Sequence, residues 1–253
     1  MKVILCCLSV LLLFLSSCSN DDNSSNAKTV LAKNIVSKEN GKERTRVFTY
    51  DGNKINTVTF SDGLVFKYTY TGDFITKRED YAEKDGKLNS SSELTYENGK
   101  LSKKIEREVG SKFYHVNRYI YNIDGTISLE QSYVDSETGI ETYDSSEKYT
   151  YVNGNLVKVE RFFSGSYNES IIEYDTKNSP FKNIIGFNLI VGDETTCSNN
   201  VIKVTRLPTE GAKTYLEKYT YKYDKNNYPI EQVITYQLGD YIFSETKQTK
   251  FTY

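Results

Sequence analysis

A triplet of an aromatic residue, any residue and a second aromatic residue recurs along this chain, and it constrains the fold more than any other feature. Successive side chains of a strand alternate between its two faces, so both aromatic side chains of a triplet lie on one face. The middle residue, often threonine or lysine, lies on the other face. The triplets are Phe48-Thr49-Tyr50, Tyr68-Thr69-Tyr70, Tyr119-Ile120-Tyr121, Tyr149-Thr150-Tyr151, Tyr219-Thr220-Tyr221 and Phe251-Thr252-Tyr253, with Leu94-Thr95-Tyr96 and Ile172-Glu173-Tyr174 as degenerate copies.

Turn residues follow most triplets, and an aliphatic residue then starts a return strand. Gly52 precedes Ile55, and Gly72 precedes Ile75. Asn-Gly and Asp-Gly pairs tolerate the positive φ of tight hairpin turns, and they stand at 40–41, 51–52, 62–63, 85–86, 98–99, 124–125 and 153–154. Long stretches with apolar residues at helical spacing are absent. The sequence therefore predicts an all-β protein, an antiparallel meander of repeated β-hairpins.

The predicted sheet has about sixteen strands, more than a flat open sheet usually carries. We expect it to be curled or solenoid-like, while a barrel-like shell and a packed sandwich stay open as alternatives. Burial of the aromatic face would supply the core. The tyrosine hydroxyls need partners, so we expect many rings at the boundary with their tips in water. The opposite face, with residues such as Thr69 and Lys222, is expected to be solvated.

An irregular insertion at about 176–214 interrupts the repeat. Ser179-Pro180-Phe181 breaks strand pairing because proline has no N–H to donate. Residues 181–185 could form one short helical turn, and Val201 to Leu207 has the composition of a strand. Two interpretations stay open: the insertion binds a ligand, or it covers the core of the folded sheet.

The first residues have the layout of a secretory signal peptide. Lys2 precedes an apolar run from Val3 to Leu15, which is short for a membrane span, and small residues then lead to Cys18. We therefore divide the chain into a signal peptide at 1–17, a flexible tether at 18–27 and a single β-repeat domain at 28–253.

Residues 15–18, Leu-Ser-Ser-Cys, resemble the processing box of bacterial lipoprotein signal peptides. The resemblance implies cleavage before Cys18, lipidation of that cysteine and residence on an envelope membrane. The following Ser19-Asn20-Asp21-Asp22-Asn23 resembles the export signal of Bacteroidetes-type lipoproteins. That likeness implies a surface-exposed position on the outer membrane, with its periplasmic face as the alternative.

The repeat unit itself resembles the tyrosine–aspartate (YD) repeats of Rhs-type proteins. Phe48-Thr49-Tyr50-Asp51-Gly52-Asn53-Lys54-Ile55 matches that unit, and so does Tyr221-Lys222-Tyr223-Asp224 with Ile230. Over the whole chain, the sequence resembles uncharacterised Bacteroidetes lipoproteins built from such repeats. The encapsulating role of the large Rhs shells does not transfer, because this chain has neither their length nor a non-repeat tail.

The sequence offers few residues that could act in catalysis, bind a metal or form a disulfide. Cys197 is the one cysteine of the predicted mature domain besides Cys18, so no internal disulfide is expected; we interpret Cys197 as a small inert residue, with a reactive thiol as the alternative. His115 is the single histidine, which excludes a histidine-rich metal cluster. Asp51, Asp62, Asp85 and Asp124 precede glycines without the spacing of a calcium loop. The sequence predicts no catalytic set, no metal site and no cofactor.

Three functions follow from these observations. The first is a monomeric, non-enzymatic envelope lipoprotein that binds a glycan or an envelope protein, with exposed tyrosines as ligand-binding candidates: Tyr70, Tyr121, Tyr151 and Tyr221. The second is a carbohydrate-active hydrolase that would use paired carboxylates such as Glu106 and Glu108, two positions apart on one strand face. The third, a membrane barrel, conflicts with the Lys, Glu and Thr opposite the aromatic residues. The formal net charge of −2 gives no basic excess for nucleic acid.

Overall fold

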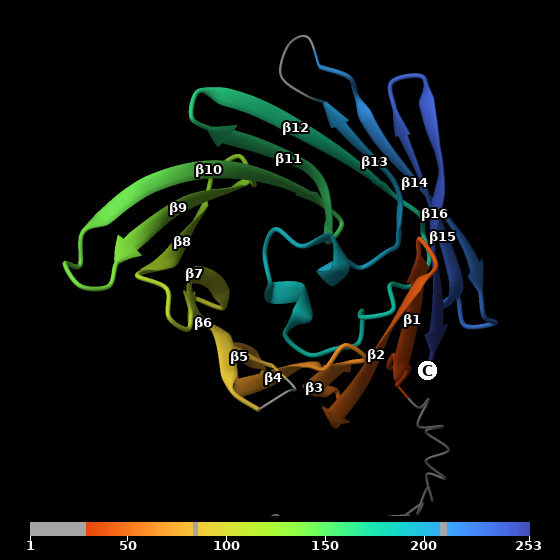
Figure 1. Cartoon of the computed structure of the whole chain (residues 1–253), viewed down its shortest axis with the longest axis horizontal. Coiled ribbons are helices and arrows are strands. Elements are labelled where there is room, and N and C mark those ends of the chain that lie inside the picture. The colour runs from red at the N-terminus through yellow and green to blue at the C-terminus, as the bar shows by residue number, and fades with distance from the viewer. Residues whose placement is uncertain (1–28, 83–85, 208–211) are drawn as a thin grey trace, which may run out of the picture.

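The chain forms a closed antiparallel barrel in which each strand pairs with its neighbours in sequence (Figure 1). The computed structural model describes residues 29–82, 86–207 and 212–253. The predicted signal peptide, Cys18, the tether and Asp85 lie outside these ranges. The strands are β1 (Asn34–Glu39), β2 (Lys42–Asp51), β3 (Lys54–Phe60), β4 (Leu64–Thr71), β5 (Phe74–Ala82), β6 (Leu88–Glu97), β7 (Lys100–Glu108), β8 (Phe113–Tyr121), β9 (Ile127–Asp135), β10 (Glu141–Val152), β11 (Asn155–Phe163), β12 (Ser166–Tyr174), β13 (Val201–Leu207), β14 (Tyr215–Tyr223), β15 (Pro229–Leu238) and β16 (Tyr241–Thr252).

The predicted antiparallel meander of about sixteen strands is confirmed, but the expectation of a curled or solenoid-like sheet is wrong. β1 pairs with β16 in a register that joins Asn34 to Thr252 and Ile35 to Phe251. This last pairing closes the sheet and removes both of its edges, which would otherwise present unpaired N–H and C=O groups. Sequence periodicity defines hairpins, whereas closure depends on the sum of twist and stagger over all the strands.

The aromatic face of each hairpin points into the barrel, and the repeat has a distinct backbone geometry there. We call the tyrosine that ends each triplet its closing tyrosine. In four hairpins the strand register shifts by one residue immediately before this tyrosine. The tyrosine is then opposite the aliphatic residue that starts the return strand. The pairs are Tyr50 with Ile55, Tyr70 with Ile75, Tyr96 with Leu101, and Tyr151 with Leu156. These four aliphatic side chains are almost fully buried. Each repeat thus places one aliphatic and one aromatic side chain at the same level of the interior.

The closing tyrosines also connect one hairpin to the previous one. At several of these positions the hydroxyl donates to a backbone carbonyl of the previous hairpin, near the start of its return strand. The contacts are Tyr96 to Ile75 (3.0 Å), Tyr174 to Leu156 (2.9 Å) and Tyr221 to Val201 (2.8 Å). Tyr253 donates in the same way to Pro229 (2.9 Å). We call the eight closing residues the tyrosine ring: Tyr50, Tyr70, Tyr96, Tyr121, Tyr151, Tyr174, Tyr221 and Tyr253. The expectation of hydroxyl tips in water is wrong at these four positions, because the neighbouring hairpin supplies an acceptor.

Residues 175–200, between β12 and β13, fold into the barrel and form a plug that the strands surround (Figure 1). Phe181 and Ile184 of the plug are buried against β2 and β3, and Cys197 is buried against β11. The plug approaches the wall closely at Gly186, where an added Cβ would lie 2.7 Å from the Asp73 carbonyl oxygen. The plug thus packs against the inner face of the wall, and both interpretations of this segment, ligand binding and core cover, stay predictions.

The secondary structure of the plug differs in detail from the expectation. Residues 181–185 form hydrogen-bonded turns, with the N–H of Ile184 donating to Phe181, rather than a helical turn. Two 3-10 helices follow, η1 (Phe187–Leu189) and η2 (Glu194–Thr196). The left-handed conformation of Gly186 at φ 81° separates the turns from η1, which a continuous helix would not allow.

The two ends of the barrel are different. At the plug end lie the tyrosine ring, the turns at 52–53, 72–73, 98–99 and 153–154, and both ends of the described chain, where the N–H of Lys33 donates to Thr252. Two clusters of buried apolar side chains fill this end around the plug. At the other end, the mouth, lie the hairpin turns at 40–41, 61–63, 164–165 and 239–240.

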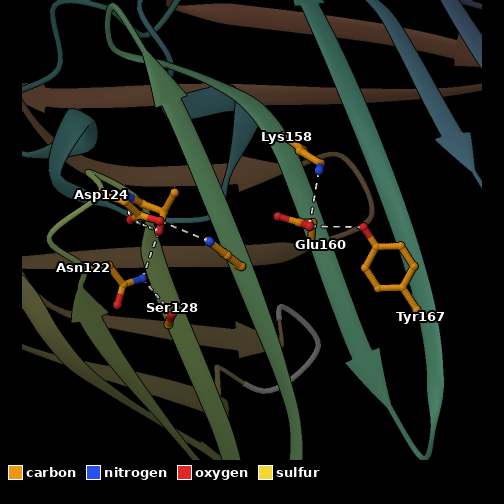
Figure 2. Close-up of polar contacts among 8 residues, drawn as sticks. Asn122, Asp124, Ser128, Lys158, Glu160 and Tyr167 are labelled. Atoms are coloured by element: carbon orange, nitrogen blue, oxygen red, sulfur yellow. Dashed lines mark hydrogen bonds and ion pairs between the residues drawn. The ribbon is translucent and has the colours of Figure 1, made fainter.

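The outer surface of the barrel carries many charged and polar side chains, together with exposed apolar ones such as Val47, Ile120 and Ile171. Outward positions of adjacent strands carry ion pairs such as Lys77–Glu79 (2.7 Å), Lys158–Glu169 (2.9 Å) and Lys203–Glu173 (2.7 Å). Figure 2 shows part of this surface, where Lys158 of β11 and Tyr167 of β12 both contact Glu160. The expected solvated face is confirmed. Within the described ranges, no helix is long and apolar enough to span a membrane.

Candidate functional site

The lumen between the plug and the mouth contains a cavity of about 460 Å³. Its lining comes from strands β2 to β11 on one side and from residues 181–196 of the plug on the other. Two further parts of the lumen adjoin it: a space of about 500 Å³ beside the β1–β2 turn at the mouth, and one of about 210 Å³ between the plug and β14–β16. The main cavity falls within the usual size range of small-molecule sites.

Aromatic side chains form the floor of this cavity. Phe181 of the plug contacts Phe48 of β2, with ring centroids 5.7 Å apart, and Phe187 at 5.9 Å. Phe60 and Phe66 meet edge to face at 4.8 Å, and Tyr68 lies beside Phe187 at 6.3 Å. We call these six residues the aromatic floor: Phe48, Phe60, Phe66, Tyr68, Phe181 and Phe187. It arises because the repeat aromatics of β2–β4 face the phenylalanines of the plug.

Above the floor, the wall carries charged side chains that are paired with one another. Nε of Arg78 lies 2.9 Å from Oδ1 of Asp80, and Nε of Arg161 lies 3.0 Å from Oε1 of Glu147. A chain of hydrogen bonds continues from Lys104 through Glu106 to Asn117, Gln131 and Ser145. No buried side-chain nitrogen or oxygen of the described residues lacks a hydrogen-bond partner. This wall is therefore polar, close to neutral and internally satisfied.

Arg46 of β2 is different from the other charged residues of the wall. Its half-buried guanidinium forms no hydrogen bond or ion pair with another side chain in the described part of the protein. Burial lowers its pKa first, and the charge of Arg44 lowers it further. Arg46 lines the main cavity and both adjoining spaces, so its side chain lies where the three meet.

The four tyrosines predicted as ligand contacts lie in the tyrosine ring rather than around the main cavity. The hydroxyl of Tyr70 donates to Ile185 of the plug at 3.1 Å, that of Tyr221 donates to Val201, and that of Tyr151 accepts the N–H of Gly192 at 2.9 Å. Tyr121 and Tyr151 line a separate space of about 290 Å³ between the plug and the hairpin turns. The hydroxyls of Tyr70 and Tyr151 thus join the wall to the plug, and that of Tyr221 joins β14 to β13.

Glu106 and Glu108, the candidate carboxylates, line a shallow space of about 270 Å³ at the mouth with His115. Glu106 is bound by Lys104 at 3.1 Å and by Asn117 at 2.8 Å. Elsewhere in the described part of the protein, the pKa of Asp124 falls to about 2 because Thr126 donates to it, and that of Glu141 falls beside Arg118. Glu106 and Glu108 share one space at the mouth, where two neighbours on the wall hold Glu106.

Cys197 is buried in the plug. The N–H of Leu156 donates to its sulfur at 3.2 Å, and the hydroxyl oxygen of Tyr174 lies 3.4 Å from that sulfur. Burial raises the pKa of the thiol, which disfavours the reactive thiolate. The described residues contain no group of three His, Cys, Asp or Glu side chains that could hold a metal.

Sequence reasoning did not identify the aromatic floor or Arg46. The sequence signal for Arg46 is its position in the alternation of the strand. It lies two residues before Phe48 and four before Tyr50, so its side chain points to the same inward face. A charge at that position breaks the pattern of threonine and lysine outside and aromatic residues inside. Phe181 and Phe187 carry no periodic signal, because their place in the lumen depends on where the plug enters.

Comparisons with known proteins bear on the fold. No protein-family model and no curated protein sequence matches the chain. Two solved structures share the architecture. A porin-like protein from Bacteroides vulgatus ATCC 8482 has a TM-score of 0.59 and 15% identity, covering 89% of this chain and 99% of its own. A porin-like protein from Bacteroides uniformis ATCC 8492 has a TM-score of 0.54 and 12% identity, covering 88% and 97%. At this identity the likeness shows the fold alone, and the resemblance to YD repeats stays a prediction.

Proposed function

We propose that this protein is a non-enzymatic lipoprotein of the outer membrane whose barrel stands in water and whose lumen binds a small, partly apolar molecule. The observation that carries the proposal is the combination of an outer surface that carries many charged side chains with a lumen cavity of about 460 Å³ that has an aromatic floor. A protein that conducts solutes needs a path through both ends, whereas buried side chains of the plug and wall fill one end here.

The charged side chains of the outer surface favour a barrel outside the bilayer. A membrane barrel presents an apolar band to lipid, and each lysine or arginine at the bilayer midplane costs about 2–4 kcal/mol. The outward Lys77, Lys158 and Lys203 alone would then cost on the order of 10 kcal/mol, similar to the whole unfolding free energy of a domain. Lipidation of Cys18 supplies a membrane attachment that leaves the barrel in water.

The position of the N-terminus supports a defined orientation on the membrane. The described chain begins at Thr29, and the carbonyl of Val30 accepts a hydrogen bond from Asn183 of the plug at 2.9 Å. A tether from Cys18 therefore joins the barrel at its plug end. The mouth then faces away from the anchoring membrane, toward an envelope or extracellular ligand.

Binding in the lumen can be tested with N-phenyl-1-naphthylamine, a neutral apolar dye that fluoresces in apolar surroundings. We expect saturable binding to residues 28–253. The substitution Thr195→Trp, on the plug surface that lines the cavity, should weaken this binding by roughly tenfold because the indole fills the space that the dye needs. Thr69→Trp places the same side chain on the outer surface and is the matched control.

Equal binding by the Thr195→Trp and Thr69→Trp proteins would contradict a lumen site. Absence of saturable binding by the wild type would contradict the proposed function itself. Unfolding by urea should be measured for both variants, so that loss of binding is separated from loss of structure.

Anchoring and orientation can be tested by protease treatment of intact cells that express the wild type or Cys18→Ala. We expect the wild type to be membrane-bound and degraded from outside, and Cys18→Ala to be released from the membrane because it lacks the lipid. Protection of the wild type until the outer membrane is opened would place the domain on the periplasmic face. Membrane binding by Cys18→Ala would refute the lipoprotein assignment.

A further inference from the structure

We infer that the lumen selects ligands that carry an anionic group on an apolar body, and that the guanidinium of Arg46 is the residue that binds the anion. This inference rests on the proposed function and specifies the ligand class for the same site. The carboxylate, sulfonate or phosphate of such a ligand would lie at Arg46, and its apolar body would cover the aromatic floor.

Among the described cationic side chains that line the main cavity, only Arg46 has no carboxylate partner. Arg78, Lys104 and Arg161 each have a carboxylate partner within 3.1 Å. Their charges are compensated, and breaking one of these pairs to bind a ligand would leave a buried carboxylate alone. Arg46 has no such partner among the described residues, so an incoming anion gains a charge-assisted hydrogen bond without displacing an internal one.

The position of Arg46 relative to the aromatic floor defines the shape of the ligand. Arg46 and Phe48 are inward residues of the same strand, two positions apart, which places their Cα atoms about 6.5–7 Å from each other. Phe60, opposite Arg46 in the β2–β3 register, and Phe181 line the same cavity. An anion bound at Arg46 would therefore have aromatic rings directly below it, as an amphipathic acid requires.

Arg44 supplies the matched comparison, because it lies on the same strand and the same inward side, one inward position nearer the mouth. Its Nε lies 2.9 Å from Asp62, and its guanidinium stacks over the Phe60 ring at 4.2 Å. Its charge is thus already compensated by a carboxylate. Removal of Arg44 changes the total charge of the mouth by the same amount as removal of Arg46, but it removes no free guanidinium.

Two dyes with the same aromatic body test the inference. N-phenyl-1-naphthylamine is neutral, and 8-anilinonaphthalene-1-sulfonate carries a sulfonate on that body. We expect the sulfonate to bind the wild type about tenfold more tightly than the neutral dye, the gain expected of one charge-assisted hydrogen bond. Arg46→Gln should abolish this ratio and leave the neutral dye unchanged, Arg46→Lys should keep part of it, and Arg44→Gln should keep all of it.

The outcomes separate the two claims. Tight binding of the neutral dye with no preference for the sulfonate, or a preference that survives Arg46→Gln, would overturn the assignment of Arg46 and leave the lumen site standing. Binding of neither dye would overturn both claims. Displacement of the sulfonate dye by sodium decanoate, but not by sodium sulfate at equal ionic strength, would support an amphipathic acid. Equal displacement by sulfate would show a site for small inorganic anions and refute the ligand class.

Discussion

Raising the pH from about 10 to about 12 is expected to unfold the barrel in one cooperative step, because the tyrosines of the ring ionise less readily in the folded state than in the unfolded chain. Burial raises the pKa of Tyr70 and of Tyr96 to about 12. It also raises the pKa of Tyr151, Tyr174 and Tyr221. An unfolded chain has tyrosines with a pKa near 10.

The direction in which stability changes with pH follows from the number of protons that the folded and unfolded states bind. Below about pH 10 the hydroxyls are neutral in both states, and their contribution to stability is complete. Between about 10 and 12 the unfolded chain loses protons that the folded barrel keeps, so the free energy of unfolding falls with rising pH. Each unit of pKa difference corresponds to about 1.4 kcal/mol, less at half-buried positions where solvent screens the charge. Over the tyrosine ring this amounts to several kcal/mol, a large part of a typical domain stability of about 5–15 kcal/mol.

The measurement is urea unfolding at a series of pH values, with tyrosinate absorbance recorded in parallel. We expect absorbance and loss of β-structure to change together. Tyr96→Phe should reduce the loss of stability at high pH, whereas Tyr143→Phe, at a position that is 60% exposed, should not. High salt at neutral pH screens the surface ion pairs and should have little effect. Gradual ionisation of the tyrosines with the barrel still folded would contradict this explanation.

Leu156→Ala is expected to destabilise the barrel by about 2–5 kcal/mol. Leu156 is 0% exposed and lies at the centre of the cluster that joins the wall to the plug. Its backbone N–H and C=O already bind Cys197 and Tyr174 and would remain in the variant. The loss would therefore come from the removed side-chain atoms and the cavity that they leave.

Leu238→Ala is the matched control, because Leu238 is 38% exposed near the mouth. Its effect should stay within about 0.5 kcal/mol. Both variants should be compared by urea unfolding, with the slope of the transition checked for a change in the unfolded state. Similar losses from the two substitutions would show that the plug end does not dominate stability.

The sequence by itself determined the hairpins, because their signals are local. Asn-Gly and Asp-Gly pairs set the turns, and the alternation within each triplet decided that aromatic residues face inward and threonine and lysine outward. The same alternation placed Arg46 on the inward face. The recurrence of the closing tyrosine defined the repeat unit, whereas the hydrogen-bond partners of its hydroxyl were not evident from the sequence.

Only the tertiary structure decided how the hairpins combine. Closure depends on the register between β1 and β16, whose residues are about as far apart in sequence as the described chain allows, and no local signal encodes that pairing. The hydroxyl acceptors of Tyr96 and Tyr174 belong to the previous hairpin, 21 and 18 residues away. The plug lacks periodicity, and its path into the lumen follows from the space that the closed barrel encloses. The absence of a partner for Arg46 among the described residues is likewise a property of the whole lumen, because it depends on where the wall and the plug place their carboxylates.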